Sequence, residues 1–209
     1  MKEIVLASAS PRRCELLKQL GIDFRIIEPD IVEDFDSGLS AGENVQRLSL
    51  YKALSVAKKI EGNALVIGAD TLVFKDGLIG KPADEKQAFE MLKLLQGSWH
   101  EVFTGVTVVD SSDLKSLGGY ERTRVKMREL PERVIKSYIA TGEPLDKAGA
   151  YGIQGIGSLL VERIDGCYFN VVGLPIVLLS RILEQFGFNL GSLVWLEEGN
   201  FASTRSGSD

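Results

Sequence analysis

The stretch that decides the fold is Ile4-Val5-Leu6-Ala7-Ser8-Ala9-Ser10-Pro11-Arg12-Arg13, in a sequence of 209 residues. Its apolar first half predicts a short buried strand. Ser10 is a preferred helix N-cap and Pro11 suits the first helical position, so we expect a helix that ends at Gly21. A strand that runs directly into a helix is typical of α/β proteins.

The rest of the sequence continues this α/β pattern, with apolar periodicity and turn residues that mark further elements. Strands are expected at 24–27, 64–74, 78–79, 99–109, 115–129 and 159–164, and helices at 40–60, 84–96, 131–140 and 174–186. We expect Gly68–Thr71 to interrupt the strand at 64–74, and the strands within 99–129 to have one solvent-facing side. The fold class is α/β, with a mixed sheet flanked by helices, and a polar tail at 191–209 is expected to be flexible.

Composition and charge narrow the range of functions. The sequence is 44% hydrophobic and 25% charged, and its net charge of −5 gives no overall attraction to nucleic acids or anionic membranes. No apolar run is long enough for a membrane span. Cys14 and Cys167 lack metal-ligand spacing and are expected to be reduced and unpaired. His100 is the one histidine, which excludes histidine-rich metal sites, and its alternating strand favours a structural role.

Ser8–Arg13 is the first candidate site. A strand delivers small residues to a helix N-terminus there, where free N–H groups and the helix dipole favour anions. Arg12 and Arg13 can each bind a phosphate through two parallel hydrogen bonds. On these grounds alone, phosphate binding and a capped helix with solvated arginines explain the segment equally well.

Two further segments carry candidate chemistry. Asp70 lies within an apolar strand, where an acid is unfavourable to bury unless it is paired or has a function. The alternative is a carboxylate that bonds a local turn. Glu143–Gly155 is rich in glycine and carries acids, a lysine and an amide, a composition often found in ligand-binding loops. A plain surface connection is the alternative for that segment.

Together these segments resemble the Maf family of nucleoside triphosphate pyrophosphatases. The matching pieces are Ser8–Arg13, Glu33, Lys52, Gly68–Thr71, Lys81-Pro82, Glu143–Gly155 and Val172–Pro175. The resemblance implies one Maf-like domain of two lobes over 1–190, with an elongated sheet and a central cleft. It also implies a divalent metal cation, Mg²⁺ or Mn²⁺, and a cytoplasmic location. Arg12, Thr71 and Gln154 resemble the specificity residues of the branch that acts on dTTP and UTP.

The expected reaction is hydrolysis to the monophosphate and pyrophosphate, which keeps non-standard nucleotides out of nucleic acids. Asp70 is the expected general base that deprotonates water, and the resemblance assigns it the same role. Individually weak as signals, Glu33, Lys52 and Lys81 match the family and complete the catalytic set that the resemblance implies. Glu33 and Asp70 are the expected metal ligands, with Asp146 as a further candidate. The residues expected to bind substrate are Ser8, Ser10, Arg12, Arg13, Thr71, Asp146, Lys147 and Gln154.

Gln154 is expected to read the base, because its amide offers an acceptor and a donor that complement thymine or uracil. Since an amide can flip, CTP is a secondary candidate, and modified pyrimidine nucleotides are others. Two alternatives stay open. One is a purine pyrophosphatase that acts on ITP or XTP. The other is a nucleotide-binding regulator of cell division with little catalysis, because Maf proteins are associated with septum formation. The expected partner is the nucleotide substrate, and a homodimer is the candidate assembly.

Overall fold

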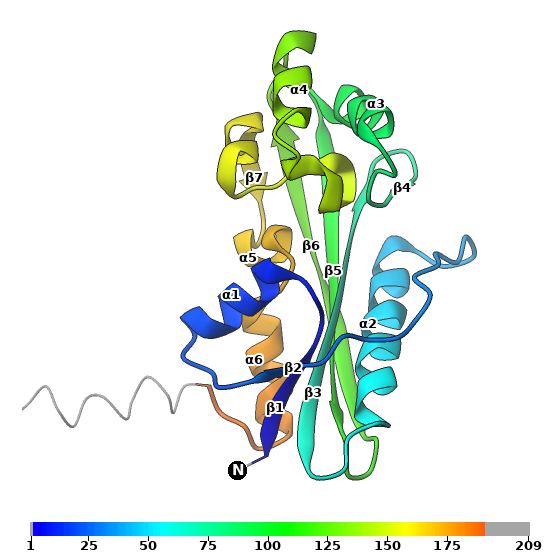
Figure 1. Ribbon diagram of the computed structural model, residues 1–209, viewed down its shortest axis with the longest axis vertical. Helices are drawn as coiled ribbons and strands as arrows, with labels where there is room; N and C mark the ends of the chain where they lie inside the picture. Colours follow the sequence, from blue (N-terminus) through cyan, green and yellow to red (C-terminus); the bar gives the residue numbers. More distant parts are fainter. Residues whose placement is uncertain (1, 191–209) are drawn as a thin grey trace, which may run out of the picture.

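The computed structural model describes residues 2–190, and Figure 1 shows the order of their elements. The strands are β1 (Glu3–Ala7), β2 (Arg25–Ile26), β3 (Ala64–Phe74), β4 (Leu78–Ile79), β5 (Trp99–Asp110), β6 (Ser116–Met127) and β7 (Val161–Asp165). The α-helices are α1 (Pro11–Gln19), α2 (Ala41–Ala57), α3 (Glu85–Leu95), α4 (Glu132–Ile139), α5 (Tyr168–Val172) and α6 (Ile176–Gln185). Between α4 and β7 lie the short 3-10 helices η1 (Glu143–Asp146), η2 (Ala148–Ala150) and η3 (Gly155–Leu160).

A seven-stranded mixed sheet runs along the long axis of the molecule (Figure 1). Its strand order is β2-β1-β3-β5-β6-β7, and β4 also pairs with β3. β1 is parallel to β2 and β3, whereas β3, β5, β6 and β7 form antiparallel pairs. The mixed α/β fold expected from the sequence is therefore confirmed.

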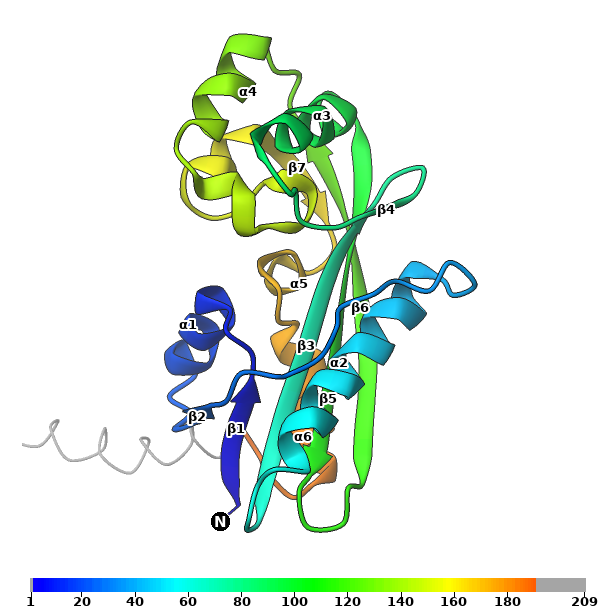
Figure 2. The same ribbon diagram turned by 45° about the vertical axis from the view of Figure 1, so that its right-hand side comes forward.

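Helix α2 covers one face of the long strands, as Figure 2 shows. It begins with the expected capping box, in which Ser40 and Glu43 exchange hydrogen bonds. Gly68 of β3 lets the helix backbone come close, because a Cβ at that position would lie 2.2 Å from the carbonyl oxygen of Ser49. Gly105 of β5 does the same, since a Cβ there would lie 2.2 Å from the Val45 carbonyl oxygen, so both glycines allow α2 to lie close to the sheet.

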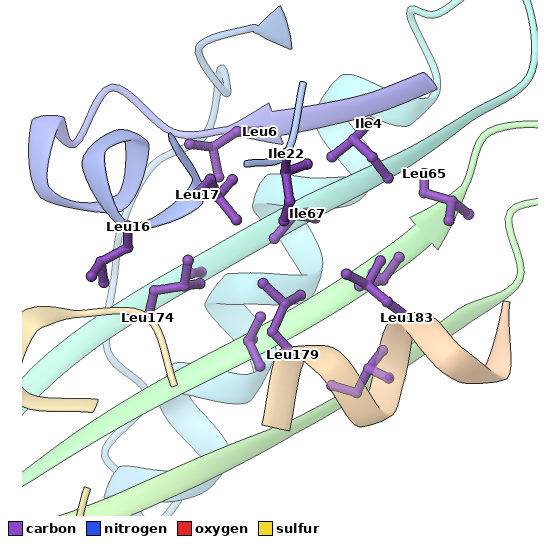
Figure 3. Close-up of a cluster of buried hydrophobic side chains, with 14 of the residues drawn as sticks. Ile4, Leu6, Leu16, Leu17, Ile22, Leu65, Ile67, Leu174, Leu179 and Leu183 are labelled. Atoms are coloured by element: carbon purple, nitrogen blue, oxygen red, sulfur yellow. The ribbon is translucent and has the colours of Figure 1, made fainter. Parts of the chain in front are cut away.

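The opposite face of the sheet is covered at its lower end by α1 and α6. Apolar side chains from both helices pack against those of β1, β3 and β5 in one buried cluster (Figure 3). The labelled members are Ile4, Leu6, Leu16, Leu17, Ile22, Leu65, Ile67, Leu174, Leu179 and Leu183. Burying each such side chain contributes roughly 1.5–3 kcal/mol. This packing fixes the turn between β1 and α1 relative to β3.

The upper end of the same face is covered by α3, α4 and the 3-10 helices (Figure 2). Their apolar side chains pack against Val73, Val102 and Val125 of the sheet in a second buried cluster. Ile67 of the first cluster and Val73 lie on one strand at an even separation, so the two clusters share a face. Between them lies the part of β3 around Thr71.

Three expectations about the elements are wrong. β3 runs without interruption through Gly68–Thr71, because β5 pairs with each residue of that stretch. β5 is largely buried rather than half exposed, since α2 lies on its other face. The segment expected as a loop forms the three 3-10 helices, and α5 was not expected, because pieces this short show no periodicity.

Cys14 and Cys167 are unpaired, as expected. Within residues 2–190 we find no helix with the length and hydropathy needed to span a bilayer. The tail expected at 191–209 lies outside the described residues.

Candidate active site

The candidate site lies at an edge of β3 that, among the described strands, is unpaired over part of its length. β1 pairs with β3 as far as Gly68, and β4 pairs with it from Val73 onward. Asp70 and Thr71 lie in the gap between these two contacts. As neighbours in a strand, their side chains point to opposite faces of the sheet. A cavity of about 610 Å³ opens at this gap, between the two ends of the molecule.

All the residues proposed from the sequence for catalysis or substrate binding line this cavity. They are Ser8, Ser10, Arg12, Arg13, Glu33, Lys52, Asp70, Thr71, Lys81, Asp146, Lys147 and Gln154. They come from the β1–α1 turn, the segment before α2, α2 itself, β3, the segment after β4 and the 3-10 region. The fold therefore brings together motifs that are far apart in the sequence.

His100 does not line the cavity. It is 3% exposed, and its Nε2 lies 2.7 Å from the hydroxyl oxygen of Tyr151, which does line the cavity. The structure therefore places His100 as the sequence suggests, in the core rather than among candidate catalytic groups.

The β1–α1 turn lies at the cavity wall, at the N-terminus of α1. The Ser8 hydroxyl accepts hydrogen bonds from the Ser10 N–H and from Arg13, each at 3.2 Å. Ser10 occupies the N-cap position of α1, but its side chain makes no capping bond, contrary to expectation. Within the part of the chain that the structure describes, no side chain caps the first-turn N–H groups of α1, an arrangement that favours an external anion.

Arg13 is buried and held on three sides. It donates to the carbonyl oxygen of Gly173 at 2.8 Å, to Ser8, and to the hydroxyl of Thr71 at 3.1 Å. Burial lowers the pKa of Arg13, while the nearby Asp70 opposes that effect. Because arginine remains protonated in proteins, Arg13 is a fixed positive charge at the cavity.

Thr71 is part of a hydrogen-bond chain that orients Arg13. Its Oγ1 lies 2.9 Å from Oγ1 of Thr104, and Thr104 donates to the carbonyl oxygen of Asn170 at 2.8 Å. Each hydroxyl has one proton to donate, so Thr104 accepts from Thr71, which in turn accepts from Arg13. Helix α5, which the sequence did not predict, thereby anchors the arginine.

Lys52 joins two of the acidic candidates. Its Nζ lies 2.5 Å from Oδ1 of Asp70 and 2.6 Å from Oε1 of Glu33. Burial alone would raise the pKa of Glu33, but the Lys52 and Lys81 ammonium groups bring it below its usual value, so this carboxylate is ionised at neutral pH. Among the described residues, Asp70 accepts a hydrogen bond from Lys52 alone, which leaves its second oxygen for a ligand.

A second cluster of ion pairs is centred on Asp146, and its pair with Arg12 joins the 3-10 region to α1 across the cavity. Asp146 accepts from Arg12 at 3.0 Å and from Lys147 at 2.7 Å. Burial alone would raise the pKa of Asp146, but Lys147 and Arg12 bring it below its usual value. The carboxylate is largely exposed, so such a pair contributes at most about 1 kcal/mol to stability and can rearrange when a ligand binds.

Several lining residues were not singled out from the sequence. Gly173 supplies the carbonyl oxygen that holds Arg13 and has a φ of 119°. It lies in the matching segment Val172–Pro175, which could have indicated it. Tyr151 lies inside the glycine-rich segment but has no charge that would have drawn attention to it. Glu28 lies in an irregular segment whose position no local pattern predicts.

The donor set suits a metal that binds together with a phosphate ligand. Glu33 and Asp70 contact the same ammonium group, so their carboxylates lie close together beside the cavity. Residues 2–190 contain no group of three or more His, Cys, Asp or Glu side chains that could hold a metal. Mg²⁺ commonly uses one or two carboxylates and completes its shell with water and substrate phosphates.

Known proteins resemble this chain over most of its length. A family model described as Maf-like protein matches residues 3–186. A dTTP/UTP pyrophosphatase of Acetivibrio thermocellus is 54% identical over 196 residues, with 91% of this chain and 98% of that protein covered. One of Caldicellulosiruptor bescii is 52% identical over 194 residues, with 91% and 98% covered.

Among solved structures, a HAM1 protein from Coxiella burnetii is 17% identical, with a TM-score of 0.45 and coverage of 75% of this chain and 79% of that one. The family match and the sequence relatives both extend over nearly all the described residues. From these matches we conclude that the chain belongs to the Maf family.

Proposed function

We propose that this chain is a nucleoside triphosphate pyrophosphatase that hydrolyses dTTP and UTP to the monophosphate and pyrophosphate. The observation that carries the proposal is the convergence of positive side chains and the carboxylate of Asp70 on one cavity. The positive residues are Arg12, Arg13, Lys52, Lys81 and Lys147. They outnumber the four acids that also line the cavity, Glu28, Glu33, Asp70 and Asp146, so the lining is slightly positive although the chain as a whole has a charge of −5. The two relatives above are both named dTTP/UTP pyrophosphatase.

The phosphates belong at the N-terminus of α1 in this proposal. Ser8 and Ser10 place that terminus at the cavity, and its uncapped N–H groups favour an anion. Arg13 is preoriented by its hydrogen bonds and loses little freedom when a phosphate binds. Arg12 and Lys147 can exchange their bonds to Asp146 for bonds to phosphate, so that Asp146 holds both cations in place before the substrate arrives.

Water is the nucleophile of the proposed reaction. As its oxygen bonds to the α-phosphorus, the bond between that phosphorus and the bridging oxygen breaks, and the electron pair leaves with pyrophosphate. Asp70 takes the proton of the water, and Lys52 orients the Asp70 carboxylate. Positioning and charge neutralisation dominate catalysis at phosphorus, so Arg13 and Lys81 contribute as fixed positive charges.

A divalent metal, Mg²⁺ or Mn²⁺, would be held by Glu33 and Asp70. When bound, it supplies additional neutralisation of phosphate charge. Lys52 contacts both carboxylates, so the protein alone keeps them together. Asp146 was a further candidate ligand, but its pairing with Arg12 and Lys147 suits it better to orient those cations.

Gln154 is our candidate for recognition of the base. Gln154 is among the residues that line the cavity, and within residues 2–190 its amide makes no hydrogen bond. The acceptor and donor are therefore available to uracil or thymine, and to cytosine when the amide flips. The Thr71 hydroxyl already makes hydrogen bonds to Arg13 and Thr104. We therefore propose that Thr71 affects selectivity indirectly, by positioning Arg13, which binds the phosphates in this proposal.

A nucleotide panel with pyrophosphate detection, with and without EDTA, tests the proposal. We expect kcat/KM for dTTP and UTP to exceed that for GTP and ITP by at least about tenfold, with CTP in between. EDTA should abolish turnover. Faster cleavage of ITP or XTP would indicate the purine alternative instead. Tight binding of nucleotide without pyrophosphate release would indicate a regulator, such as the one proposed for cell division.

We further propose that residues 1–190 form one domain of two lobes, that the protein acts in the cytoplasm, and that it assembles as a homodimer. The long strands shared by both ends of the molecule support the single domain. A single cooperative thermal unfolding transition is expected for one domain. A sedimentation mass of twice that of the chain is expected for a homodimer.

A further inference from the structure

Tyr138 and Glu143 lie outside the cavity but hold the loop that carries Gln154. Tyr138 is a buried residue of α4, and its hydroxyl oxygen accepts a hydrogen bond from the Gly152 N–H at 3.1 Å. The same hydroxyl donates to Oε1 of Glu143 at 2.9 Å. The backbone is thus fixed two residues before Gln154.

Glu143 fixes the backbone on the other side of Gln154. Its carboxylate oxygens accept hydrogen bonds from the N–H groups of Ile156 and Gly157, each at 3.0 Å. Burial alone would raise the pKa of Glu143, but these N–H groups and the Tyr138 hydroxyl bring it below its usual value. The carboxylate therefore stays ionised at neutral pH, and its bonds to the loop are charge-assisted.

The loop packs so closely here that it has little freedom to move. A Cβ at Gly157 would lie 2.3 Å from the Gly152 carbonyl oxygen and 2.6 Å from the Tyr138 hydroxyl. Backbone and phenol are therefore in direct contact. Glu143 is also joined to Lys147, one of the cations proposed to bind phosphate. The Lys147 ammonium donates a hydrogen bond to the Glu143 carbonyl oxygen at 2.5 Å.

We propose that Glu143, together with Tyr138, is a positioning residue for base selectivity, which holds the Gln154 amide in register with the pyrimidine edge without touching the substrate. This inference rests on the proposed function, because it requires Gln154 to read the base. Base selection by hydrogen bonds depends on accurate placement of the side chain that makes them. A displacement of roughly 1 Å within an active site can lower the reaction rate about a hundredfold. A loosened loop should therefore impair discrimination between bases more than the chemical step.

Glu143→Gln tests the inference with little change in size. The amide replaces one accepting oxygen with an NH₂ group that faces a backbone N–H. We expect the UTP-over-GTP ratio of kcat/KM to fall about fivefold or more, mainly through a higher KM for UTP, with kcat within about threefold of wild type. Tyr138→Phe removes the hydroxyl that joins Gly152 to Glu143 and should shift the ratio in the same direction.

A double-mutant cycle shows whether Glu143 acts through Gln154. If it does, Glu143→Gln lowers the UTP-over-GTP ratio in the wild-type background but not in the Gln154→Ala background. Equal effects in both backgrounds, or equal losses for UTP and GTP, would show that Glu143 only supports the fold and would overturn the inference. A Gln154→Ala variant with an unchanged ratio would overturn it as well.

Glu132→Gln and Tyr51→Phe are matched controls. Glu132 forms a surface ion pair with Lys93 at 3.2 Å, and Tyr51 is 45% exposed, with no hydrogen bond to its hydroxyl within residues 2–190. Neither control should change the ratio. Calorimetric dissociation constants for the α,β-methylene analogues of UTP and GTP give a binding ratio without turnover, and Glu143→Gln should lower that ratio as well. They test the inference even if the wild-type protein releases no pyrophosphate, an outcome that would reject only the proposed function.

Discussion

Asp70 and Lys52 show how one contact serves both stability and the proposed chemistry. Both side chains are buried, and an unpaired charge at either position would be unfavourable by several kcal/mol. Their contact at 2.5 Å offsets much of that penalty and aims the carboxylate at the cavity. The sequence indicated that Asp70 needs a partner or a function, and the structure supplies a partner beside the candidate site.

Asp70→Asn should lower kcat about 10²–10⁴-fold, because an amide cannot take the proton from water. The fold should persist, since the shape is kept and Lys52 retains Glu33 as a partner. Turnover of UTP at saturating metal, with far-UV circular dichroism as a check on folding, measures this. Asp165→Asn is a suitable control, because within residues 2–190 the Asp165 side chain makes one ion pair, an exposed one with Arg124 at 3.7 Å. If Asp70→Asn turned over UTP at a near wild-type rate, Asp70 would not be the general base.

Lys52→Met should move the acid limb of the pH–rate profile to higher pH. Lys52 is the strongest of the charges that lower the pKa of Glu33, so its loss raises that pKa and the carboxylate protonates earlier as pH falls. The profile of kcat/KM for UTP between pH 5 and 9 measures the shift. Lys59→Met, at a residue whose side chain is 60% exposed, should leave the profile in place. If the acid limb of the profile did not move in Lys52→Met, ionisation of Glu33 would not be required for the reaction.

At the scale of elements, the sequence predicted what local patterns encode. The β1–α1 unit, the capping box of α2 and the hairpin of β3 and β4 all follow from residues close in sequence. The continuity of β3 through Gly68–Thr71 could not be predicted, because it depends on pairing with β5. Neither could α5, which is short and is held by tertiary hydrogen bonds such as that of Asn170 to the Val102 carbonyl oxygen.

Gly68→Ala should impair both stability and activity through the packing of α2 on β3. The new Cβ would meet the Ser49 carbonyl oxygen and the Ala53 N at 2.2 and 2.7 Å, so the helix must move. Overpacking of this kind costs about 1–3 kcal/mol. Because Lys52 precedes Ala53 on α2, the displacement also pulls it from Asp70. Thermal unfolding should shift downward, and kcat for UTP should fall about tenfold or more.

Gly119→Ala is the matched control for that experiment. It also lies within a strand, and among the described residues its added Cβ would meet Leu178 alone, at 3.5 Å, which is ordinary van der Waals contact. Both its stability and its turnover should stay near wild type. A Gly68→Ala protein as active as this control would show that α2 tolerates the displacement without moving Lys52 from Asp70.

At the scale of the whole molecule, the candidate site was largely predictable as a set of residues but not as a geometry. Motifs with recognisable chemistry identified the charged and amide groups that line the cavity. The gap on β3 between β1 and β4 follows only from strand order and register. The support of Arg13 by Gly173, 160 positions later in the chain, likewise has no local signal.

His100 makes the stability of the whole fold depend on pH. Burial lowers its pKa to about 4 from an ordinary 6.5, so between these values the unfolded chain binds a proton that the folded chain does not. Stability is therefore full above pH 6.5 and declines as pH falls toward 4, by about 2–3 kcal/mol. His100→Gln can keep the bond to Tyr151 without titrating, so urea unfolding at pH 7.5 and 4.5 should show a smaller loss in that variant. Equal losses in both proteins would mean that carboxylates alone govern the acid sensitivity.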